Sequence, residues 1–282
     1  MRRREAGRAA GVTCHSGPVS DYSAGRTEAR RRVFEASAET YHRARPDYPE
    51  ELFEDLERIA GLHRGSVVIE VGSGTGLCTQ HLAARGYALR CIEPAEAMAA
   101  VAKAHIGDAF EHVAERFEDF QAPAGSVDLV IAATSWLWVD PAVGFAHAAE
   151  LLAPDGHFAH AWQTLVGLGP EGFEEALAAI YAEEAPELGG TFNSQRTVAD
   201  GWAEKIGQCG LFSEPEIHEY RYQRDFDGEG FVASASTYGM HAGIDPERRE
   251  RLDARVVALV DDRFGGAVTR FERSLLFVSS PL

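Results

Sequence analysis

The chain has 282 residues and a mass of 30.7 kDa, with 45% hydrophobic and 25% charged residues. That composition is ordinary for a globular protein, and it excludes collagen-like, low-complexity and wholly disordered chains. The longest apolar run, Leu129–Val139, is eleven residues long. A helix of that length cannot cross a bilayer, so we expect no membrane contact.

Charge is distributed unevenly along the chain. The net charge is −17, yet residues 1–32 hold eight arginines against three acids, so the rest of the chain carries −22. Because so acidic a body repels phosphate backbones, nucleic acid is not an expected partner. Residues 1–30 are predicted to be a disordered basic tail, since glycine, serine and alanine dilute the arginines; an interaction tail is the alternative. No apolar segment follows the arginines, so no secretory signal is predicted there.

The four cysteines are Cys14, Cys78, Cys91 and Cys209. They lie far apart in the sequence, have no CxxC spacing and have no histidine cluster beside them. This pattern favours reduced thiols and a cytoplasmic protein over a disulfide framework or a zinc site.

The middle of the chain alternates between strand and helix patterns. Helices are expected over residues 31–62, with Pro49 in the first turn of the second one. Short apolar runs predict buried strands at 67–71, 88–92, 111–114, 127–132 and 157–162. Helices are expected between them at 77–85, 95–105 and 141–152. This spacing predicts right-handed βαβ units and an open, doubly wound α/β sheet.

The last third of the chain has a different pattern. Helices are expected at 172–184, 199–208, 229–242 and 246–264, and strands at 217–223 and 268–278. The helices at 171–185 and 229–242 could cover a pocket above the strand ends, with Tyr181, Phe231 and Tyr238 available to line it.

A glycine-rich loop follows the first predicted strand, in the run Glu70-Val71-Gly72-Ser73-Gly74-Thr75-Gly76. Glycines between a strand and a helix allow a tight turn and let a ligand approach the backbone. The spacing G-x-G-x-G differs from the dinucleotide fingerprint G-x-G-x-x-G. Glu70 before the loop is a poor neighbour for a pyrophosphate and suits a ligand with an ammonium group.

A second acid, Glu93, ends the next predicted strand, twenty-three residues after Glu70. An acid in that place can accept hydrogen bonds from both hydroxyls of a ribose. The pair predicts an adenosine-like ligand whose other end is zwitterionic, and S-adenosylmethionine fits this description. The alternative is that the loop is only a tight strand-to-helix turn.

These motifs resemble those of class I S-adenosylmethionine-dependent methyltransferases of the type 11 small-molecule group. The specific matches are Val68–Gly76, Cys91–Pro94 continuing to Met98, and the Tyr…Arg-Pro-x-Tyr-Pro pattern of Tyr41–Pro49. Weaker matches are Phe117–Phe120, Asp128–Val130 and Leu151–Gly156.

The resemblance covers residues 31–282 and implies a single methyltransferase domain. Its parts would be N-terminal helices (31–62), a cofactor-binding Rossmann-like half (63–165), and cap helices with the last two strands (166–282). It implies a seven-stranded sheet whose first five strands are parallel and whose C-terminal hairpin strand is antiparallel.

The resemblance also implies roles for individual residues. The loop backbone would hold the methionine part of the cofactor, Glu70 would face its amino group and Glu93 its ribose. Met98, Phe117 and Glu118 would surround the adenine. Tyr41 and Arg45 would close the cofactor end, with Arg45 available to the carboxylate. The complete set of implied cofactor residues is Glu70, Gly72, Ser73, Gly74, Gly76, Glu93, Pro94, Met98, Phe117, Glu118, Thr134, Tyr41 and Arg45.

Two departures from the family pattern concern the acceptor side. Leu137-Trp138 stands where relatives often have His-Trp, and Pro154-Asp155-Gly156 where they often have Pro-Gly-Gly. The first change removes a polar group near the acceptor pocket. No catalytic residue is assigned, because a dedicated base is needed only if the acceptor must lose a proton to react. His160 and Trp136 are candidates, with a structural histidine and simple packing as the alternatives.

Three classes of function are therefore open. The leading one is a methyltransferase acting on a small molecule. The others are a non-catalytic S-adenosylmethionine-binding protein and an NAD-dependent dehydrogenase, which the glycine spacing disfavours.

Overall fold

The computed structural model describes residues 38–188, 201–238, 241 and 243–282. The predicted basic tail at 1–30 lies outside the described residues, as do residue 199 and part of the helix expected at 229–242. Within the described ranges, no helix has the length and apolar character needed to cross a membrane.

One seven-stranded sheet organises the molecule, with the strand order β3-β2-β1-β4-β5-β7-β6. The first five strands run parallel, and β7 is antiparallel to both of its neighbours. This confirms the predicted doubly wound sheet with a C-terminal antiparallel hairpin strand, which is inserted between β5 and β6. The strands are β1 (Val67–Val71), β2 (Ala88–Ile92), β3 (Glu111–Val113), β4 (Val127–Ala133), β5 (Leu152–Gly169), β6 (Glu216–Phe226) and β7 (Val268–Ser279).

Helices cover both faces of the sheet. One core unites residues of β1 and β4 with Leu52, Phe53 and Leu82 from the helices on one side, and the other contains Phe145 and Trp202 from the opposite side. The helices are α2 (Ala38–Ala44), α3 (Glu50–Ile59), α4 (Thr79–Ala84), α5 (Glu96–Ile106), α6 (Gly144–Leu151), α7 (Phe173–Glu184), α9 (Trp202–Gln208), α10 (Gly228–Ser236) and α11 (Pro246–Ala258). Short turns of other helix types occupy Trp136–Trp138, Pro186–Leu188 and Leu259–Arg263.

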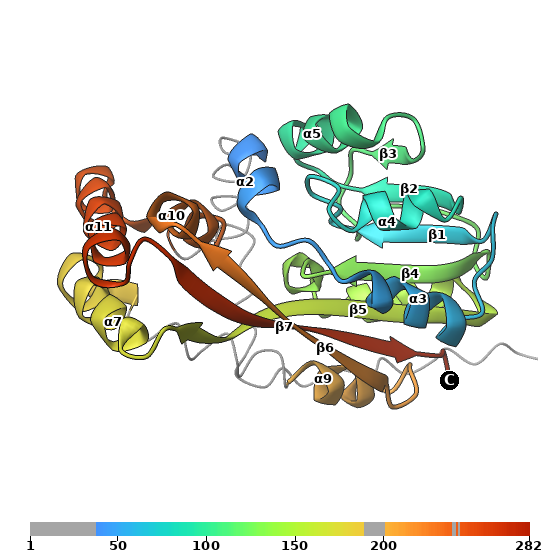
Figure 1. The fold of residues 1–282 in the computed structure, drawn as a ribbon. Coiled ribbons are helices and arrows are strands. Elements are labelled where there is room, and N and C mark those ends of the chain that lie inside the picture. The colour runs from blue at the N-terminus through green and yellow to red at the C-terminus, as the bar shows by residue number, and fades with distance from the viewer. Residues whose placement is uncertain (1–37, 189–200, 239–240, 242) are drawn as a thin grey trace, which may run out of the picture.

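Three long strands carry the cap. Figure 1 shows β5, β6 and β7 running out of the core sheet towards α7, α10 and α11. These helices have an apolar core of their own, which includes Phe173, Leu177, Phe231 and Leu252. Helix α10 also packs against α2, so the N-terminal part of the chain meets the cap.

Several boundaries differ from the sequence-based expectation. Strand β5 continues to Gly169 instead of ending at 162, because β7 pairs with it as far as the Gly169–Thr269 register. The segment Pro154-Asp155-Gly156 lies inside β5, where the register with β4 shifts. Helix α6 begins at Gly144 rather than at 141, and α10 ends at Ser236. Such shifts arise because pairing with distant strands sets strand ends more strongly than local pattern does.

Candidate active site

The glycine loop lies where β1 ends, at the carboxyl edge of the parallel strands. Its backbone is fastened to β2, since the Gly72 amide donates to the carbonyl of Ile92 at 2.8 Å. Gly72, Gly74 and Gly76 have φ of 68°, 56° and 87°. This left-handed backbone favours glycine, so the conformation itself accounts for the spacing of the three glycines.

The three glycines meet different surroundings. A Cβ on Gly76 would lie 2.7 Å from Cδ1 of Ile106 and 2.9 Å from Cβ of Ala102, and one on Gly72 would lie 2.6 Å from Cβ of Ser135. At Gly74 the nearest atom would be Cε of Met98 at 3.5 Å, which is ordinary contact. Gly72 and Gly76 therefore serve close packing of the fold, and the remaining glycine leaves the loop backbone approachable.

Glu93 joins the loop to the end of β2. Its carboxylate accepts the Gly74 amide at 2.9 Å and the Ala95 amide at 2.8 Å, and the residue is 9% exposed. A carboxylate has about four acceptor positions, so it can hold the loop and bind ligand hydroxyls at the same time. One side chain can therefore hold the amides at the loop and before α5 and still bind a ligand.

Glu70 lies beneath the loop and is only 1% exposed. The hydroxyl of Thr79 donates to its carboxylate at 2.7 Å, and the thiol of Cys91 lies 3.5 Å from the same oxygen. Burial raises the pKa of Glu70 to about 7. The contacts tie β1 to β2 and the start of α4; the expected contact with a ligand amino group stays a prediction.

Met98 and Phe117, the apolar residues implied for the adenine, lie in separate buried clusters. Met98 is buried with Ala38 and Ala95, and Tyr41 packs against this group. Phe117 is buried, with its ring centroid 5.5 Å from that of Trp136. The roles of these two residues at an adenine site remain predictions.

Glu118 is held by two partners. It accepts the Asp140 amide at 2.8 Å and forms an ion pair with Arg116 at 2.6 Å. Partial burial by itself would raise the pKa of Glu118, but the hydrogen bond from Arg116 outweighs it, and the pKa is lowered. The side chain is therefore an anionic acceptor at neutral pH.

The segment 45–48 crosses the end of β4 and the interior of β5 at Gln163. The hydroxyls of Tyr48 and Thr134 are 2.9 Å apart, and the side-chain amide of Gln163 donates to the carbonyl of Asp47 at 2.9 Å. Arg45 is 9% exposed, and its guanidinium lies 4.5 Å from the ring centre of Tyr238 in the cap. The sequence reasoning did not select Gln163, although a polar residue directly after the apolar run of a buried strand is a recognisable signal.

His160 and Trp136 are both packed in the interior. His160 is fully buried, with Nδ1 3.0 Å from the carbonyl oxygen of Ala132, and burial lowers its pKa to about 3. A group with that pKa is a poor general base at neutral pH. Trp136 is 3% exposed and packs against Phe145 and Phe158 at ring distances of 5.2 and 4.7 Å. These contacts favour the structural role for each.

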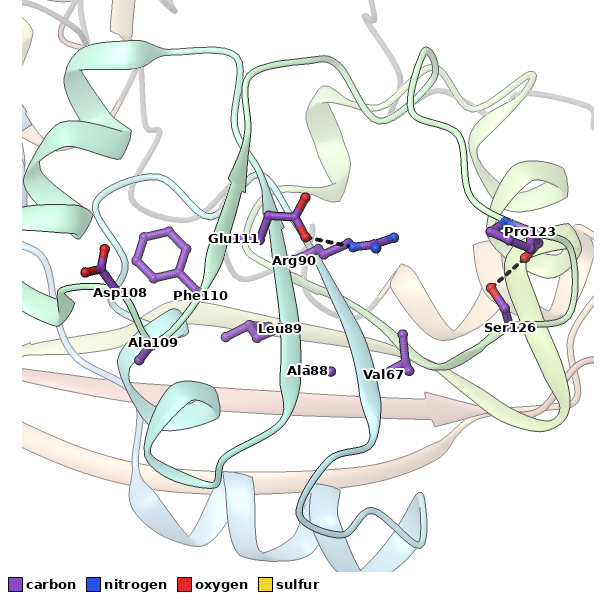
Figure 2. Close-up of a pocket in the computed structure, with 10 residues that line it drawn as sticks. All are labelled: Val67, Ala88, Leu89, Arg90, Asp108, Ala109, Phe110, Glu111, Pro123 and Ser126. Carbon is purple, nitrogen blue, oxygen red and sulfur yellow. Dashed lines mark hydrogen bonds and ion pairs between the residues drawn. The ribbon is translucent and has the colours of Figure 1, made fainter.

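A hollow of about 510 Å³ lies at the opposite edge of the sheet. Figure 2 shows its lining, which includes Val67 and Ala88, the first residues of β1 and β2, and the ion pair between Arg90 and Glu111 at 3.0 Å. Ligands of open α/β sheets bind at the carboxyl ends of the strands. The hollow is therefore distinct from the candidate site at the glycine loop.

Residues 69–160 match the family model described as a methyltransferase domain. Over this segment the chain is similar to methyltransferase domains. Its curated relatives include an uncharacterised methyltransferase of Mycobacterium tuberculosis, 31% identical over 131 residues, which are 46% of this chain and 52% of the relative. Another, from Geobacillus sp., is 32% identical over 105 residues, or 35% of this chain and 49% of the relative. The chain thus spans about half the length of these relatives.

Solved structures share the fold of this chain. A candidate type II methyltransferase from Anaeromyxobacter dehalogenans has a TM-score of 0.59 and 22% identity, and the match covers 83% of this chain and 97% of that one. The phosphoethanolamine N-methyltransferase 2 of Haemonchus contortus, solved with phosphomonomethylethanolamine and S-adenosylhomocysteine, has a TM-score of 0.52 and 13% identity. That match covers 90% of this chain and 59% of that one.

Proposed function

We propose that this chain transfers a methyl group from S-adenosylmethionine to a small-molecule acceptor. The observation that carries the proposal is the carboxylate of Glu93, which is held against the Gly74 amide at the end of β2. An acid so placed, beside an approachable glycine backbone, suits the hydroxyls of a ribose.

Two buried hydroxyl groups in the glycine loop also fit such a cofactor. Among the described residues, the hydroxyls of Ser73 and Thr75 are buried in the loop without a hydrogen-bond partner. Buried polar groups in folded proteins are nearly always paired, so unpaired hydroxyls at a loop of this kind are consistent with a ligand that bonds them.

When bound, S-adenosylmethionine supplies a methyl group on a positively charged sulfur, which an acceptor can take by in-line displacement. The protein then needs chiefly to hold the acceptor atom in line with the methyl group and the sulfur. In this proposal the loop backbone holds the amino-acid end, Glu93 the ribose, and Met98 and Phe117 the faces of the base. His160 contributes no proton transfer, because it stays neutral and buried.

Two measurements test the proposal. Calorimetry should show binding of S-adenosylhomocysteine and no binding of NAD to the full chain. Incubation with methyl-labelled S-adenosylmethionine and a library of small molecules should then transfer label to at least one of them. Tight NAD binding without S-adenosylhomocysteine binding would refute the methyltransferase function. Cofactor binding without turnover on any acceptor would instead support a non-catalytic binding protein.

A further inference from the structure

A polar stripe interrupts the buried face of β7. Arg270, Glu272 and Ser274 alternate along this strand, and each is no more than 3% exposed. On one side they are followed by Leu276 of the sheet core, and on the other by Val268 of the cap core. Charged side chains of β7 thus lie between the apolar core of the sheet and that of the cap.

Arg270 is the centre of this group. It donates to the hydroxyls of Ser234 and Tyr238, both at 2.7 Å, and forms an ion pair with Glu272 at 2.9 Å. Arg224 of β6 reaches the same Glu272 at 3.3 Å. Tyr238 in turn lies beneath the guanidinium of Arg45, so three arginines from distant parts of the sequence converge. We call Arg45, Arg224 and Arg270 the arginine cluster.

The arginine cluster has more positive than negative charge. Within the described part of the chain, the carboxylate that forms ion pairs with it is Glu272. Arg224 and Arg270 also stand directly opposite each other in the β6–β7 register. Like charges at paired positions are destabilising, and uncompensated buried charge costs free energy. An additional anion at this place would remove both penalties.

Polar atoms around the cluster also lack partners. Nε of Arg270, Nη2 of Arg224 and Oε1 of Gln163 are buried and without a hydrogen-bond partner in the described structure. Two of these atoms are guanidinium donors, which hydrogen-bond oxyanions in charge-assisted geometry. The unused donors and the excess positive charge therefore point to the same kind of ligand.

The cluster is connected to the methyltransferase site through one short segment. Arg45 begins the stretch that ends at Tyr48, whose hydroxyl meets Thr134 after β4. Gln163, which stands opposite Ser274 of the polar stripe in the β5–β7 register, is hydrogen-bonded to the backbone of the same stretch. A ligand held by the arginines would thus extend along residues 45–48 towards the carboxyl end of β4.

We propose that the methyl acceptor carries an oxyanion, a carboxylate or a phosphate, which the arginine cluster binds. This inference rests on the proposed function, and it adds the chemical class of the acceptor. In a chain with a net charge of −17, a local cationic site offsets the long-range repulsion of an anionic substrate.

The test uses the full chain saturated with S-adenosylhomocysteine. Succinate, inorganic phosphate and the uncharged succinamide are titrated into the wild type and into Arg270→Met. At least one anion should bind the wild type, and Arg270→Met should weaken it at least about tenfold, because charge-assisted bonds from the guanidinium are lost. The affinity for S-adenosylhomocysteine should change less than about twofold. Binding of succinate or of phosphate alone identifies which oxyanion the site prefers.

Arg221→Met is the matched control. Arg221 stands opposite Arg273 on the same pair of strands and shares Glu219 with it, but its side chain is 72% exposed. Removing this charge should leave anion binding unchanged. Arg224→Met provides a second test should Arg270→Met fail to fold, and it should weaken the anion in the same direction.

Four results would overturn the inference. In the first, the wild type binds S-adenosylhomocysteine but no anion, and in the second it binds succinate and succinamide equally. In the third, Arg270→Met and Arg224→Met both keep the wild-type affinity for the anion. In the fourth, these variants lose affinity for the anion and for S-adenosylhomocysteine equally. The last would assign the arginines to the cofactor carboxylate. A wild type that does not bind S-adenosylhomocysteine overturns the proposed function itself, and the acceptor assignment with it.

Discussion

Replacing Glu93 by glutamine should weaken both the cofactor site and the fold. The substitution keeps the shape of the side chain, so it creates no cavity, but it removes the charge and turns one acceptor into a donor. In the wild type the two oxygens accept the amides of Gly74 at 2.9 Å and Ala95 at 2.8 Å. A glutamine can accept from only one of these amides, and its NH₂ group faces the other.

The magnitude follows from those two bonds. A hydrogen bond to a charged group contributes roughly 1.5–3 kcal/mol net. We expect the free energy of unfolding to fall by about 2 kcal/mol, which lowers Tm by roughly 4–8 °C in a chain of this size. If the same carboxylate also accepts ribose hydroxyls, the affinity for S-adenosylhomocysteine should fall by about 2–3 kcal/mol, or on the order of 30–150-fold.

Differential scanning calorimetry and isothermal titration with S-adenosylhomocysteine on the same preparation measure the two effects. Glu111→Gln is the control, since Glu111 lies on the neighbouring strand and its ion pair with Arg90 is largely exposed. That variant should leave both quantities nearly unchanged, because surface ion pairs contribute little. A lowered Tm with unchanged cofactor affinity for Glu93→Gln would refute the reasoning, because Glu93 would then only hold the loop.

Three further predictions concern buried groups and the loop. Burial raises the pKa of Glu70 to about 7, so its contribution to stability is greatest below pH ~4.5 and is lost as pH rises through 7. Glu70→Gln should therefore match the wild type near pH 4 and exceed it above pH 7 by on the order of 2 kcal/mol in urea denaturation; equal stability at both pH values would contradict this. The pH dependence that His160 contributes has the opposite sign. Its pKa is lowered to about 3, so its contribution to stability is lost as the pH falls below about 6.5. The Tm of His160→Leu should therefore depend less on pH between 4 and 6.5 than the Tm of the wild type. Gly76→Ala should cost about 2–4 kcal/mol of unfolding free energy and Gly74→Ala about 1–2, since only the former meets atoms at 2.7 and 2.9 Å; equal losses in Tm would show that the packing difference is unimportant.

Local sequence patterns were sufficient to predict the main features of the cofactor half, residues 63–165. The apolar run at Val67–Val71 is buried, and its glycines take the left-handed backbone that glycine favours. Glu93 is found at the end of β2 beside the loop because strand length and loop length place it there. These features depend on residues close in sequence, so periodicity and turn chemistry predict them.

The cap and the arginine cluster could not be predicted from local sequence, because both are formed by tertiary contacts. The length of β5 was set by pairing with β7, more than a hundred residues away, and no local pattern in residues 163–169 encodes that partner. Arg270 and Glu272 could be recognised as charges on alternate positions of a strand, but not as buried ones. Their burial exists only because α10 and the segment from Arg45 close over that face of the sheet, and the register with β6 sets Arg224 opposite Arg270. Sequence fixes which charges a strand carries, whereas the partners that fold over it decide whether water or another side chain solvates them.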